Sequence, residues 1–70
     1  MRERKKFVVH TYRIHGGHKE RKFKLITYAL SYASQEFMKN DTYKVKVWDL
    51  NKGPIERNNP NAPALIHTFS

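Results

Sequence analysis

Four histidines are the side chains in this sequence with the widest range of chemistry, and two of them flank a Gly-Gly pair. Imidazoles can take up and give protons near neutral pH, so two of them could cleave RNA if a cation such as Arg13 or Lys44 held the phosphate. The sequence contains no nucleophilic-triad motif and no phosphate-binding P-loop motif. We therefore expect a non-catalytic protein and keep a small ribonuclease as the third alternative. The four are His10, His15, His18 and His67.

The same histidines are poor candidates for a metal site. The chain has no cysteine, which also excludes a disulfide scaffold, and the acid nearest to His15 and His18 is Glu20. A closed tetrahedral site would need distant ligands such as His10 or His67. We expect no metal and no cofactor.

Basic residues are concentrated in the first third of the 70-residue chain. Residues 1–24 contain nine Lys or Arg and two acidic residues, whereas residues 25–70 contain five and four, and the net charge is +8. This asymmetry predicts an acidic partner, most commonly nucleic acid, with an acidic host-protein surface as the alternative. The other interpretation is a solvated face that keeps a small protein soluble.

We predict phosphate contacts from a flexible basic arm, residues 1–6, and from the segment 18–24. The Gly16-Gly17 pair allows close backbone approach to a phosphate. Basic residues before a helix oppose its dipole, so a binding role would explain their presence. The predicted nucleic-acid contacts here are Arg2, Arg4, Lys5, Lys6, Arg13, His18, Lys19, Arg21, Lys22 and Lys24.

Hydrophobic patterns indicate the elements that position these residues. Residues 7–15 predict a strand that Gly16-Gly17 ends, and residues 18–22 predict a charged connection. Apolar residues at helical spacing then predict a helix that begins near Lys22 and ends near Asn40, with a core stripe. Residues 43–48 alternate and predict a strand, followed by a turn at 49–54, a short strand at 55–57, a loop at 58–63 and a last strand at 64–69. The stripe is Phe23, Ile26, Leu30, Ala33 and Phe37, with Ala29 at its edge.

This order predicts one small α+β domain over residues 7–70, arranged β-α-β-β with a further C-terminal strand. One helix would pack on one face of a three- or four-stranded, mainly antiparallel sheet. The link through the helix could make the strands at 7–15 and 43–48 parallel. No apolar run spans a membrane and no signal-peptide core follows the N-terminus, so we expect a cytoplasmic protein with no membrane partner.

The sheet face away from the helix is predicted to bind nucleic acid. If Tyr43, Val45 and Val47 face the helix, Lys44, Lys46 and Trp48 face away. The first strand is apolar on both faces at its start; if Phe7, Val9 and Thr11 face the helix, His10 and Tyr12 face away with them. Bases would stack on Tyr12 and Trp48 while the lysines neutralise phosphates. Alternatively the C-terminal segment, or a second copy in a homodimer, covers this face.

A second surface is predicted on the helix, opposite its core stripe. Leu25, Tyr28 and Tyr32 cluster there and would form a protein-contact stripe. The alternative function is therefore a regulator or inhibitor that binds a host protein. The plainer interpretation is that the C-terminal tail covers these side chains or that the tyrosines lie flat on the helix.

Two segments carry a resemblance. The run from Tyr28 to Ala33, followed by residues 43–55, resembles in layout the small uncharacterised proteins encoded by bacteriophages and other mobile elements. This resemblance implies a short non-catalytic protein that binds one host macromolecule during host takeover. The Gly-His run at 15–18 resembles the catalytic region of HicA-type mRNA interferases, which implies the ribonuclease alternative.

Overall fold

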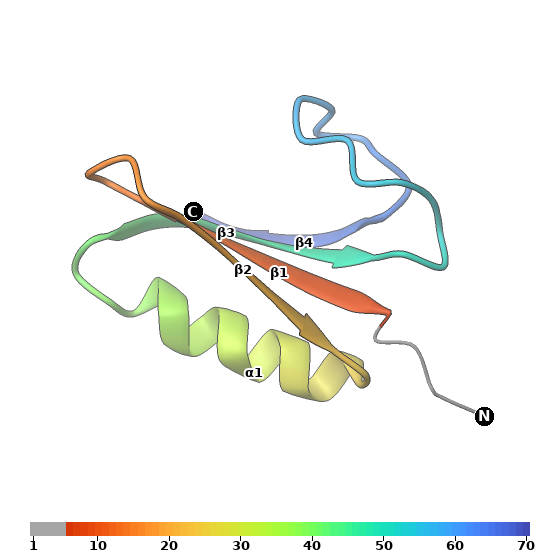
Figure 1. Cartoon of the computed structure of the whole chain (residues 1–70), viewed down its shortest axis with the longest axis horizontal. Helices are drawn as coiled ribbons and strands as arrows, with labels where there is room; N and C mark the ends of the chain where they lie inside the picture. Colours follow the sequence, from red (N-terminus) through yellow and green to blue (C-terminus); the bar gives the residue numbers. More distant parts are fainter. Residues whose placement is uncertain (1–5) are drawn as a thin grey trace.

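The described part of the chain folds into an antiparallel four-stranded sheet with one helix on one face (Figure 1). The structure is a computed structural model that describes residues 6–70. The strand order is β2-β1-β3-β4, and every neighbouring pair is antiparallel. The predicted α+β class, with one helix on a mainly antiparallel sheet, is confirmed. The elements are β1 (Phe7–Arg13), β2 (His18–Phe23), α1 (Ile26–Phe37), β3 (Thr42–Asp49) and β4 (Leu65–Phe69).

The largest difference from the sequence prediction is β2, which occupies the segment expected to be a charged connection. Five of its six residues are exposed, and only Phe23 is half-buried. An edge strand needs backbone partners on one side only, and β1 provides them from Phe7↔Phe23 to Tyr12↔His18. A tight turn closes this hairpin, with Gly16 at φ 86°, a value that favours glycine.

This hairpin also determines the direction of β1 relative to β3. Because the chain reverses in the hairpin before it enters α1, β3 pairs with β1 antiparallel, and the parallel crossover suggested by the sequence is wrong. Two smaller differences concern ends and turns. The helix ends at Phe37 with Met38 as its C-cap, before Asn40, and residues 55–57 form no strand.

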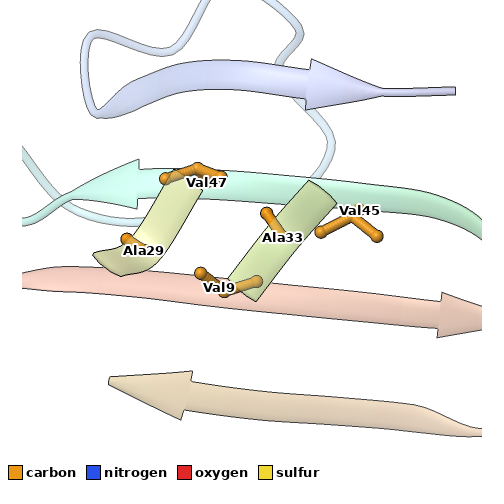
Figure 2. Close-up of a cluster of buried hydrophobic side chains, with 5 residues drawn as sticks. All are labelled: Val9, Ala29, Ala33, Val45 and Val47. Atoms are coloured by element: carbon orange, nitrogen blue, oxygen red, sulfur yellow. The ribbon is translucent and has the colours of Figure 1, made fainter. Parts of the chain in front are cut away.

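The main core lies between α1 and the sheet. Val9, Val45 and Val47 point from the two central strands toward Ala29 and Ala33, and all five are fully buried (Figure 2). Alanine side chains let the helix backbone approach the valines closely, so Ala29 lies at the centre of the contact and not at its edge. Larger side chains surround this cluster: Phe7, Phe23, Ile26, Leu30, Tyr32, Phe37 and Phe69.

A second core lies on the opposite face of the sheet, under the segment 50–64. This segment folds back over the sheet on the side away from α1 (Figure 1), and it buries Val8 and Trp48 beneath Ala62 and Ala64. Its return is held by the Asp49 N–H, which donates to the Ala64 carbonyl at 2.7 Å. One helix and one loop therefore cover parts of opposite faces.

The helix α1 has 12 residues, whereas a membrane span needs about 20. Among residues 6–70, no helix is a candidate for crossing a membrane.

Ala33→Leu should destabilise the protein by about 1–3 kcal/mol, because the added carbons have no space between α1 and the valines. The measurement is the urea-unfolding midpoint followed by circular dichroism. Gln35→Leu, at an exposed position of the same helix, is the matched control and should stay within about 0.5 kcal/mol. Equal effects of the two changes would contradict this packing.

Candidate nucleic-acid interface

The pairing register arranges the sheet face away from α1, here called the outer face, in three cross-strand rows. Residues directly opposite each other on neighbouring strands share a face. The first row is Lys22, Val8, Trp48 and Leu65, the second is Glu20, His10, Lys46 and Thr68, and the third is His18, Tyr12 and Lys44.

The first row is largely covered by the segment 50–64. Trp48 is fully buried with Val8 beneath Ala62 and Ala64. An indole with no exposed face offers no surface for a base, so the structure does not place Trp48 where the sequence prediction needs it. The alternative of a C-terminal cover holds for this row. Lys22, at its β2 end, remains exposed.

The second row contains a buried histidine. The Nε2 atom of His10 lies 2.9 Å from Oε2 of Glu20, and the His10 ring meets the ring of His18 edge-on at 5.2 Å. Burial is the largest effect and lowers the pKa of His10; Glu20 acts against it, and Arg57 and the neighbouring His18 lower the pKa further. A neutral His10 can then donate its Nε2 hydrogen to the Glu20 carboxylate, which fixes the tautomer.

The third row carries the accessible rings. The Tyr12 ring, which is half-buried, stacks on His18 at 5.4 Å with an interplanar angle of 23°. The Lys46 ammonium lies 6.0 Å from the centre of the Tyr12 ring. Tyr43, which is 51% exposed, lies 6.4 Å from Tyr12. Rings and an ammonium group therefore adjoin on an open part of the sheet.

Tyr43 was missed by the sequence analysis because strict alternation assigns it to the helix side. The pairing shifts between Tyr12↔Lys44 and Arg13↔Thr42, which leaves Tyr43 as the extra residue of a bulge. A bulge turns side chains away from the regular alternation. No sequence signal marks this bulge.

Arg57 was also missed, since it comes from the loop over the first row. The Lys46 ammonium donates a hydrogen bond to the Arg57 carbonyl at 3.2 Å. The Arg57 charge is close enough to influence both His10 and Tyr12. We define the outer-face cluster as His10, Tyr12, His18, Tyr43, Lys44, Lys46 and Arg57.

The remaining predicted contacts do not gather in one place. Arg21 and Lys19 alternate onto the helix side of β2, where Arg21 lies 5.3 Å from the Tyr32 ring. Arg13 donates to Asp41 at 2.8 Å. Lys6 and Lys24 are exposed at the outer ends of β1 and β2. The predicted arm contacts Arg2, Arg4 and Lys5 lie outside the described residues.

The predicted helix stripe divides into two parts. Leu25, the N-cap residue, and Tyr28 are 52% and 63% exposed. Tyr32 is half-buried against the main core, and its hydroxyl donates to Glu36 at 3.1 Å. Burial alone would raise the pKa of Glu36, but the hydrogen bonds from Lys39 and Tyr32, together with the positive charges of Lys39 and Lys19, lower it. Tyr32 thus has a structural role.

Comparison of the chain with protein-family models, with curated proteins and with solved structures finds no match. Within residues 6–70, no three His, Asp or Glu side chains gather as a metal site. What the outer-face cluster can do follows from its rings and cations alone.

The free energy of unfolding should fall as the pH drops from about 7.5 to about 5.5. The pKa of His10 is below its ordinary value of 6.5 in the folded protein, so the unfolded chain binds this proton more readily. The contribution of neutral His10 to the free energy of unfolding is complete above pH 6.5 and is lost as the pH falls below that value. His10→Gln should flatten the profile measured by urea unfolding, whereas the exposed-turn control His15→Gln should keep it. An unchanged slope in His10→Gln would contradict this assignment.

Proposed function

We propose that the protein binds single-stranded nucleic acid through the outer-face cluster, without catalysing a reaction on it. The observation that carries this proposal is the group around Tyr12, whose ring stacks on His18 and lies near the Lys46 ammonium. Unstacked bases can lie on such rings, and the neighbouring cations can meet the phosphates between them. In a duplex the base faces are already stacked, so the rings would have nothing to bind.

Charge supports the same face. The three rows contain one carboxylate, Glu20, and it is engaged by His10. The rows also contain Lys22, Lys44 and Lys46, and Arg57 lies beside them. The net charge of +8 attracts a polyanion from a distance, and the basic residues before β1 would add contacts that depend on salt but not on sequence.

The proposal predicts that a labelled single-stranded oligonucleotide of mixed sequence binds, with an affinity that falls steeply between about 50 and about 200 mM salt. Lys44→Ala should weaken binding and reduce the salt slope by about 1. Tyr43→Ala should weaken binding by about 1–3 kcal/mol and leave the slope unchanged, because stacking releases no counterions. Fluorescence anisotropy measures both quantities.

Lys52→Ala is the matched control, since it removes the same charge from the exposed turn after β3. If Lys52→Ala weakens binding as much as Lys44→Ala, the attraction is general and not located on the outer face. Absence of binding at the lower salt would refute the proposal. Tighter binding of duplex than of single strands would refute its stacking part.

A further inference from the structure

The two edges of the sheet differ sharply in charge. In β2 four of the six residues are charged, whereas β4, with the sequence Leu-Ile-His-Thr-Phe, has no Lys, Arg, Asp or Glu. Charged side chains on an edge strand discourage pairing with another chain. Within the described part of the chain, β2 is protected in this way and the outward edge of β4 has neither charges nor a partner strand.

An open groove of about 520 Å³ lies beside β4 on the helix side. Figure 2 shows Ala29 and Ala33 lying over β1 and β3, so α1 is centred on these two strands and its contact with β4 is confined to residues such as Phe37, which packs beside Phe69. The bulge between Val47↔His67 and Trp48↔Leu65 leaves Ile66 as the extra residue, and Ile66 lines the groove. The lining residues are Leu30, Ser31, Ser34, Ile66, His67 and Phe69.

The groove belongs to an uncharged side of a strongly basic molecule. Residues 26–35 of α1 contain no Lys, Arg, Asp or Glu, and neither does β4. Two copies that each carry +8 repel each other most where their cations face, and least through this side. A strongly basic or acidic partner would find no opposite charge on this side to bind. A second copy can associate here through apolar contacts and strand pairing, which need no charge.

We propose that the protein forms a symmetric homodimer in which β4 pairs antiparallel with β4 of a second copy. An antiparallel pairing of one strand with itself is self-complementary and closes after two copies. It would join the two sheets into one and bring the two grooves together. Backbone pairing of short strands alone is marginal in water, so burial of Leu30, Ile66 and Phe69 from both copies supplies the rest.

This dimer is independent of the nucleic-acid proposal. It uses the edge of β4 and its helix side, and it includes none of the outer-face cluster. Disruption of the dimer should leave nucleic-acid binding by each copy intact, and removal of Tyr43 or Lys44 should leave the dimer intact. The experiments can therefore show that one proposal fails while the other holds.

The test is sedimentation velocity over a wide range of protein concentration. The unchanged protein, of 8.4 kDa, should sediment with twice its chain mass at high concentration. Ile66→Lys places two like charges in the shared groove and should weaken dimerisation by about tenfold or more. Tyr28→Lys adds the same charge at an exposed position of α1 outside the groove and should leave the dimer unchanged.

Ser34→Lys is the second groove variant, because Ser34 is exposed and its replacement spares the core if Ile66→Lys fails to fold. It should also give a monomer with an unchanged circular dichroism spectrum. A protein that remains monomeric at every concentration overturns the proposal. A dimer that persists in folded Ser34→Lys also overturns it. A dimer that only Tyr28→Lys dissociates overturns it as well and would place the contact at Leu25 and Tyr28.

Discussion

A four-stranded sheet has two faces to cover, and residues 6–70 contain one helix. That constraint organises the rest of the molecule. The helix reaches the central strands closely because Ala29 and Ala33 meet the valines there, and the segment 50–64 covers Val8 and Trp48 on the other side. Neither cover extends across its whole face. The parts left open are the outer-face cluster around Tyr12, apart from the buried His10, on one side of the sheet and the groove beside β4 on the other.

Partial cover also explains the chemistry of the outer face. His10 lies at the border between the loop-covered row and the open row, so it is buried while its neighbours His18 and Tyr12 reach solvent. Burial and the nearby Arg57 lower the pKa of His10 and so favour its neutral form, and Glu20 accepts its hydrogen. The only carboxylate of the three rows is thereby engaged, which leaves the lysines to set the sign of the surface.

The predictable parts of the fold are those with a hydrophobic period. The alternation at 43–48 identified β3, and the helical spacing identified α1, but the predicted start near Lys22 was wrong, because Lys22 and Phe23 belong to β2 and the helix begins at Ile26. β2 could not be found in this way, because an edge strand with five exposed residues has no apolar alternation. Tyr43 was placed on the wrong side because a bulge breaks the alternation locally. The burial of Trp48 could not be predicted in this way. It is covered by Ala62 and Ala64, and two alanines in a loop sequence do not indicate a contact with the sheet.

The distribution of charge separates the molecule into regions that suit different contacts. Lysines and arginines occupy β2 and the outer face, whereas the α1 side beside β4 is uncharged. A polyanion would be drawn to the first region by long-range attraction, which weakens with salt. An association through the second region depends on buried apolar area and strand pairing, which salt screens far less. One small sheet can therefore present two contacts that respond oppositely to ionic strength, because repulsion between two basic copies also declines as salt is added.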